Sequence, residues 1–269
     1  MGLIKSYRSD RAGNLAVQGG PTWEKLLITE APVSRTVNRS DDEAIVTSAS
    51  TSGNVNSVTL ADVASNLGSG TAVNNNNCAI YAWPLTDKDG FPILHDMCFS
   101  VRIFINVTAS PGNEDNDCFI MAGISDGATN MTTGRCGGGM IWDNATGRKP
   151  VTSGIGTGIT KGTADADSLG AIVQINTLPP GCKFTVNTLY TYLLDSGNDL
   201  ERERSSMAQH LYQGSASAPA ERKVDPVYIA LWLGRTANGA GNKNFSFEMY
   251  YSVDPGCTYK GFSNNDPLW

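Results

Sequence analysis

Hydrophobic and polar residues alternate along two long stretches of the sequence. Residues 99–107 place an apolar side chain at every second position, and residues 245–253 repeat the pattern. A period of two turns one row of side chains toward a core and the other row outward, which is typical of a half-buried β-strand. Further strands are predicted from apolar runs at residues 79–85, 117–124, 171–175, 184–194 and 227–233.

Turn-rich segments separate these strands, and helix signals are scarce. The loops, rich in Gly and Asn, lie at residues 123–139, 154–170 and 234–244. The three glycines at 137–139 indicate a turn or bulge. One short helix is expected where Asn198 is followed at helical spacing by Leu200, Arg204, Met207 and Leu211. The sequence therefore predicts an all-β protein, an antiparallel jelly-roll β-sandwich with an extended N-terminal arm and one short helix.

Changes in amino-acid composition divide the chain into three parts. Residues 1–77 are dominated by Ser, Thr, Asn and small apolar residues, and such a segment gains order mainly by lying against something else. We therefore expect an arm at 1–77, the sandwich at 78–254 and a tail at 255–269. Neither end can form a core of its own, and the residues expected to dock on adjoining subunits are Trp23, Phe262 and Trp269.

Composition and charge exclude several classes of protein. The net charge of −6 and the pI of about 4.9 exclude a broad basic surface for nucleic acid. No apolar run reaches the ~18 residues of a membrane helix, and the start of the chain does not resemble a signal peptide. The 6 cysteines include no close pair, so we expect buried thiols rather than a zinc site. No cofactor, nucleic acid or membrane partner is expected.

No arrangement of residues predicts catalysis. The two histidines, His95 and His210, lie near no nucleophile motif. Glycoside hydrolysis needs two carboxyl groups at a defined separation, whereas Glu248 is the single acid of the last predicted strand. We therefore expect a protein that is not an enzyme, and cleavage of a glycan remains a third hypothesis.

Two segments are candidates for ligand binding. Asp87 and Asp89 resemble part of a calcium loop, although Asp stabilises turns as well and the turn is the preferred interpretation. Trp142 followed by Asp143 and Asn144 combines an aromatic face with groups that hydrogen-bond sugar hydroxyls. The competing interpretation, which we prefer, makes this tryptophan an ordinary core or interface residue.

Some segments resemble a known architecture. Residues 121–127 and 230–235, followed by the aromatic strand that ends with Tyr250 and Tyr251, resemble a concanavalin-type jelly-roll sandwich across roughly residues 78–254. The acidic, Asn/Thr/Gly-rich composition is similar to that of bacteriophage virion proteins. The resemblance implies a sandwich displayed outward and an arm or tail that anchors it. No metal or sugar ligand is carried over, because no lectin motif is recognisable.

Two hypotheses for function follow. The leading one is a non-enzymatic structural component of a phage virion, either a capsid decoration or cement protein or a tail protein. It would form a homo-oligomer, with a trimer suspected, and would contact other virion proteins such as the major capsid protein. The alternative is a carbohydrate-binding receptor-recognition module whose ligand is a host surface glycan.

Overall fold

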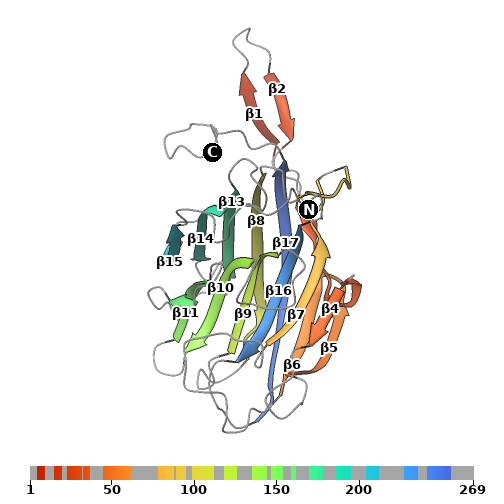
Figure 1. Cartoon of the computed structure of the whole chain (residues 1–269), viewed down its shortest axis with the longest axis vertical. Helices are drawn as coiled ribbons and strands as arrows, with labels where there is room; N and C mark the ends of the chain where they lie inside the picture. Colours follow the sequence, from red (N-terminus) through yellow and green to blue (C-terminus); the bar gives the residue numbers. More distant parts are fainter. Residues whose placement is uncertain are drawn as a thin grey trace, which may run out of the picture.

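Two stacked antiparallel sheets and one separate hairpin make up the described part of the chain (Figure 1). The computed structural model describes residues 5–9, 15–19, 23–31, 33–36, 45–61, 78–87, 89–94, 99–111, 118–125, 135–143, 147–153, 159–161, 170–177, 186–194, 204–211, 227–235 and 241–255. The predicted antiparallel β-sandwich is confirmed. The only helical element in these ranges is the 3-10 turn η1 (Ile28–Glu30).

The first layer is an eight-stranded sheet with the order β15-β14-β13-β8-β17-β6-β5, and β3 pairs with β17 as well. Its strands are β3 (Glu24–Lys25), β5 (Val46–Ser52), β6 (Val55–Leu60), β8 (Phe99–Ala109), β13 (Gly170–Thr177), β14 (Val186–Leu194), β15 (Arg204–Leu211) and β17 (Lys243–Pro255). The longest strand, β17, pairs with β8, β6 and β3, so it connects the middle of this layer to the N-terminal strands.

The second layer is a seven-stranded sheet with the order β12-β11-β10-β9-β16-β7-β4. Its strands are β4 (Val33–Thr36), β7 (Cys78–Pro84), β9 (Cys118–Ser125), β10 (Arg135–Asp143), β11 (Gly147–Ser153), β12 (Ile159–Lys161) and β16 (Tyr228–Arg235). Neighbouring strands in both layers run antiparallel, as the alternating pattern of the sequence predicts for sheets built from hairpins and longer returns.

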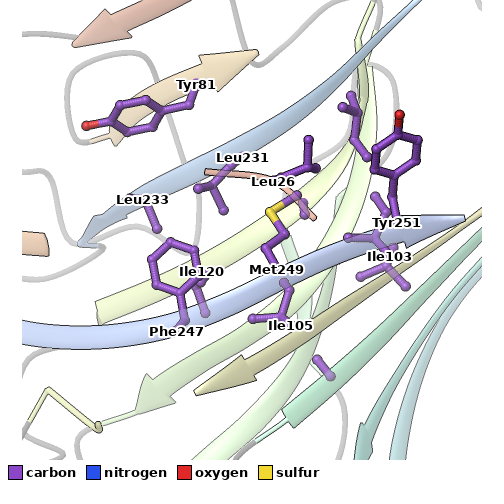
Figure 2. Close-up of a cluster of buried hydrophobic side chains, with 14 of the residues drawn as sticks. Leu26, Tyr81, Ile103, Ile105, Ile120, Leu231, Leu233, Phe247, Met249 and Tyr251 are labelled. Carbon is purple, nitrogen blue, oxygen red and sulfur yellow. The ribbon is translucent and has the colours of Figure 1, made fainter. Parts of the chain in front are cut away.

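The main core lies between the two sheets and is built from the inward rows of the alternating strands. Figure 2 shows Phe247 and Met249 of β17 facing Leu231 and Leu233 of β16. All four side chains are buried, and each buried side chain of this size contributes about 1.5–3 kcal/mol. The interface between the layers is therefore the main source of stability.

A second apolar cluster covers the outer face of the seven-stranded sheet. Its buried members are Ile80, Phe119, Met121, Ile141, Val151, Ala230 and Trp232. They alternate along their strands with core residues, as Phe119 and Met121 alternate with Ile120. The seven-stranded sheet is thus apolar on both faces. Among the described strands, the row that remains partly exposed to solvent is the outer row of the eight-stranded sheet.

The glycine run lies inside a strand, so the predicted turn or bulge is wrong. Gly137 and Gly139 occupy the middle of β10, opposite Gly123 and Met121 of β9. A Cβ atom at Gly137 would lie 2.6 Å from the carbonyl oxygen of Ala122 and 2.7 Å from the ring of Trp232. Glycine is needed here because the indole ring lies directly against the backbone of β10.

The predicted helix is also wrong for its described part. Residues 204–211 form strand β15, which pairs with β14 in the register Tyr192↔Met207, whereas Asn198 and Leu200 lie outside the described residues. A short isolated helix is marginal in water. Hydrogen bonds to the edge of β14 therefore favour a strand, although the local spacing of apolar residues favours a helix.

The predicted arm is corrected for its central part, since strands β3 to β6 belong to the two sheets. Ser, Thr and Val are compatible with edge strands that need little apolar surface, and this is why composition suggested an arm. By contrast, β1 (Lys5–Ser9) and β2 (Leu15–Gly19) pair with each other and stand beyond the upper end of the sandwich in Figure 1. Trp23 is half-buried beside β3, and Phe262 and Trp269 lie outside the described residues.

Asn56 of β6 fixes the N-terminal segment to the sandwich. Its side chain is fully buried. The Oδ1 atom accepts a hydrogen bond from the backbone N–H of Ile28 at 2.9 Å, and Nδ2 donates to the carbonyl oxygen of Leu26 at 3.0 Å. One amide thus satisfies two backbone groups of the segment that leads from β3 into η1.

Replacing Asn56 by Ala is expected to lower the free energy of unfolding by about 2–4 kcal/mol, because two buried backbone groups lose their partners. Urea denaturation measures the loss, and limited proteolysis is expected to cut the variant near residues 23–31. Asn244→Ala, at an exposed position, is the matched control and is expected to stay within about 1 kcal/mol of the parent. Equal stability of the two variants would contradict this assignment.

Gly137→Ala is expected to lower the free energy of unfolding by about 1–3 kcal/mol, because the added methyl group has no space beside Ala122 and Trp232. Chemical denaturation monitored by tryptophan fluorescence measures both stability and the surroundings of the indole. Thr108→Ala, at an exposed strand position, serves as control. A variant as stable as the parent, with unchanged fluorescence, would show that the contact is not tight.

Candidate functional site

The outer row of β8 and β17 carries a compact group of polar and aromatic side chains. The pairing of the two strands places Tyr250 opposite Phe104 and Glu248 opposite Asn106. Their neighbours in sequence, such as Ile105 and Met249, point into the core. Alternation therefore directs this group to the solvent side of the eight-stranded sheet.

Five residues of this face form a polar group, which we call the outer-face network. Its members are Lys25, Asn54, Tyr250, Glu248 and Asn106. Lys25 Nζ donates to Asn54 Oδ1 at 3.1 Å, and Asn106 Nδ2 donates to Glu248 Oε2 at 3.0 Å. Tyr250 belongs to the same group, because the side chains of Asn54 and Glu248 both influence the pKa of its hydroxyl group.

Electrostatics keep the hydroxyl group of Tyr250 protonated. Burial raises the pKa of Tyr250 above its usual value of 10.0, the negative charge of Glu248 and the hydrogen bond to it raise the pKa further, and the bond from Asn54 acts in the opposite direction. At neutral pH the phenol is therefore protonated and can donate a hydrogen bond. It is poorly suited to act as a general base.

An aromatic surface lies next to the network. The rings of Phe104 and Tyr250 are stacked, with centroids 6.3 Å apart and an interplanar angle of 18°. Phe104 is half-buried, so part of its surface faces solvent. Asn106 Oδ1 is buried and has no hydrogen-bond partner among the described residues, so this acceptor is not open to solvent. The face thus combines an apolar platform with donors and acceptors in fixed positions.

The neighbouring part of the same face is held rigid by hydroxyl and amide pairs. The hydroxyl groups of Ser57 and Ser246 are 2.8 Å apart, and Thr59 Oγ1 donates to Asn244 Oδ1 at 2.7 Å. These cross-strand pairs connect β6 to β17. The backbone that carries Glu248 and Tyr250 is therefore supported on both sides, by β8 and by β6 with β3.

A second tyrosine holds β3 in place from the core side. The hydroxyl group of Tyr251 donates to Glu24 Oε2 at 2.6 Å and lies 3.2 Å from Thr86 Oγ1. Because Glu24 precedes Lys25 on β3, this contact positions the lysine of the outer-face network. Burial and the hydrogen bond to Glu24 raise the pKa of Tyr251 to about 12.

The structure does not support the predicted sugar site at Trp142. This side chain is 1% exposed and packs in the core, with its ring centroid 5.8 Å from that of Phe245, so it offers no face to a ligand. The preferred interpretation, an ordinary core tryptophan, is the correct one. Asp143 ends β10 opposite Gly147, and Asn144 lies outside the described residues.

The predicted calcium loop is a turn. Asp87 Oδ1 accepts hydrogen bonds from the backbone N–H groups of Asp89 and Phe91, both at 2.9 Å, and Gly90 takes a positive φ of 83°. The carboxylate of Asp87 is thus used within its own turn. No group of three metal-ligating side chains occurs among the residues that the structure describes.

Sequence reasoning missed most of the outer-face network. Phe104 and Tyr250 are aromatic residues in the outward rows of two alternating strands, and this departure from the polar pattern was the available signal. The pattern does not reveal that β8 and β17 are neighbours. Lys25 and Asn54 come from the segment that was interpreted as an arm, and they were therefore not considered.

Comparisons with known proteins give likenesses in structure only. No family model and no curated protein matches the chain. Among solved structures, the chain is similar to the CBM2 module of the evolved Dit of Lactobacillus casei BL23 phage J-1, with 11% identity, a TM-score of 0.44 and coverage of 87% of this chain and 97% of that one.

Two further solved structures give similar values. Arcelin-5, a lectin-like defence protein from Phaseolus vulgaris, has 11% identity and a TM-score of 0.41, covering 87% of this chain and 98% of that one. An alginate lyase of polysaccharide lyase family 7 has 11% identity and a TM-score of 0.38, covering 82% and 93%. These proteins differ in function, and none of their functions is transferred to this chain. Within the described ranges, no helix has the length and hydropathy needed to cross a membrane.

The raised pKa of Tyr251 predicts a loss of stability at high pH. The folded state favours the protonated phenol, so the contribution of Tyr251 is complete below pH 10.0 and is lost as the pH rises toward about 12. The free energy of unfolding is expected to fall in this window by up to about 1.4 kcal/mol per pH unit for this group. Urea denaturation at several pH values measures the slope.

Tyr251→Phe is expected to make this slope shallower. Tyr81 and Tyr250 also have raised pKa values, so part of the slope persists in this variant. Identical slopes for the parent and Tyr251→Phe would contradict the assignment.

Proposed function

We propose that the protein is a non-enzymatic carbohydrate-binding module whose binding surface is the outer face of the eight-stranded sheet. The observation that carries the proposal is the outer-face network lying beside the stacked rings of Phe104 and Tyr250. Sugars present hydroxyl groups that both donate and accept hydrogen bonds, along with apolar C–H faces. The network supplies donors and acceptors, and the exposed part of Phe104 supplies an apolar surface.

Binding is favoured over cleavage by the separation of the carboxyl groups. The acids of β17 are Glu248 and Asp254, which are six residues or about 20 Å apart along the strand, and β8 has none. Hydrolysis of a glycosidic bond requires a second carboxyl group about 5–9.5 Å away. Glu248 is, in addition, already engaged by Asn106 and Tyr250, so its role is to hold polar groups in position and to accept hydrogen bonds from a ligand.

A second candidate function, a structural component of a phage virion, is favoured by the N-terminal hairpin. Strands β1 and β2 pair with each other and with no strand of the sandwich. An isolated two-stranded hairpin is at best marginally stable in water, so contact with an adjoining subunit would stabilise it. The two proposals are compatible, because a receptor-recognition module on a particle needs both an anchoring end and a glycan-binding face.

Glycan-array screening of the parent protein is expected to identify a bound oligosaccharide. With that oligosaccharide, Glu248→Gln and Phe104→Ala are each expected to raise the dissociation constant by about tenfold or more, equivalent to about 1.4 kcal/mol. Glu30→Gln makes the same chemical change at an exposed acid on η1 and is expected to have no effect. Isothermal titration calorimetry measures the constants.

Two results would overturn the proposal. Absence of binding to every glycan would leave the virion component as the remaining candidate. Release of reducing ends by the parent protein, abolished in Glu248→Gln, would show that the face is catalytic.

A further inference from the structure

Strand β5 forms an open edge of the eight-stranded sheet. It pairs with β6 on one side, from Val46↔Leu60 to Ser52↔Val55, and ends the order of strands on the other. Most of its residues are exposed. Val46 and Ser48 flank a shift in register, so the regular part of the strand runs from Ser48 to Ser52. No described strand pairs with the outer side of this part.

The four edges of the sandwich differ in how they are protected. Proteins usually block an open edge with a short strand, a charged side chain or a proline. Strand β12 has three residues including Lys161, strand β4 has four including Arg35, and β15 carries Arg204 and His210. Strand β5 has seven residues, VTSASTS, with neither a charge nor a proline. It is therefore the one described edge of the two sheets that lacks these features.

We propose that β5 pairs antiparallel with β5 of a second copy of this chain, around a two-fold axis at Ser50. This register places Ala49 opposite Thr51 of the second copy and Ser48 opposite Ser52. Every opposing pair then consists of small neutral side chains, with no like charges facing each other and with hydroxyl groups able to bond across the strands. One edge serves both copies, because an antiparallel pair of identical strands is self-complementary.

The inner side of β5 is already supported within each copy. The hydroxyl group of Thr29 on η1 lies 2.9 Å from that of Thr51 on β5. The edge is thus held in position before association, which lowers the entropic cost of pairing. A second copy is favoured over an unrelated extended peptide because it supplies the same neutral, regular five-residue segment.

The pairing would extend the eight-stranded sheet across both copies. Residues opposite each other in an antiparallel pair lie on the same face, so the two outer faces become continuous. If the proposed carbohydrate binding is correct, the dimer presents two outer-face networks on one side and gains affinity for repeating glycans by avidity. The dimer itself does not depend on that function.

Sedimentation velocity of the full chain across a range of concentrations tests the dimer. The parent is expected to sediment as a dimer, and Ser50→Lys, which places two ammonium groups opposite each other at the axis, is expected to weaken association by at least about tenfold. Thr108→Lys adds the same charge at an exposed position of β8 that lies away from the edge and is expected to remain dimeric. Circular dichroism confirms that each variant is folded.

Mixing Ser50→Lys with Ser50→Glu provides a rescue, since opposite charges then face each other at the axis. The mixture is expected to form a heterodimer, whereas each variant alone is monomeric. A monomeric parent, an assembly larger than a dimer, or a dimer that Ser50→Lys leaves intact would overturn the proposal. The affinity per site of monomeric Ser50→Lys for a glycan is expected to match that of the parent, so failure of carbohydrate binding and failure of the dimer are distinguishable.

Discussion

The register between β8 and β17 is the constraint on which the rest of the structure depends. One row of each strand enters the core, and the alternate row forms the outer face. A slip of one residue would bury Glu248 and expose Phe247, because the period of a strand is two. The buried carboxylate would cost several kcal/mol, and the exposed ring would lose its burial. Core stability therefore fixes the position of the site.

The two sheets differ in how far their outer faces are exposed to solvent. The seven-stranded sheet has apolar residues on both faces, and the ring of Trp232 on β16 requires glycine in β10, which lies beyond β9. Burying these tryptophans costs free energy. The indole N–H groups of Trp83, Trp142 and Trp232 are buried without hydrogen-bond partners among the described residues. The eight-stranded sheet places its half-exposed row toward solvent. In the proposed function, the eight-stranded sheet is the one that binds the ligand.

The sequence predicted the strands that alternate strongly and missed the features that depend on pairing. Residues 99–107 and 245–253 lie in β8 and β17 as expected, because period two is a local signal. Strands β3 to β6 were misassigned because Ser-rich and Thr-rich edge strands resemble a linker in composition. The helix at 204–211 failed because the edge of β14 supplied hydrogen bonds that no local pattern reveals. Trp142 was a candidate by residue type alone, and burial excluded it.

The central claim is that the register of β17 creates both the core and a binding face on opposite sides of the same strands. Mapping of backbone amide chemical shifts by NMR, during titration with an oligosaccharide that binds, tests this claim most directly. The account predicts that the perturbed amides cluster in β8, β17 and the adjoining residues 25 and 54. Perturbations confined to the seven-stranded sheet or to the turn at residues 87–91 would contradict it.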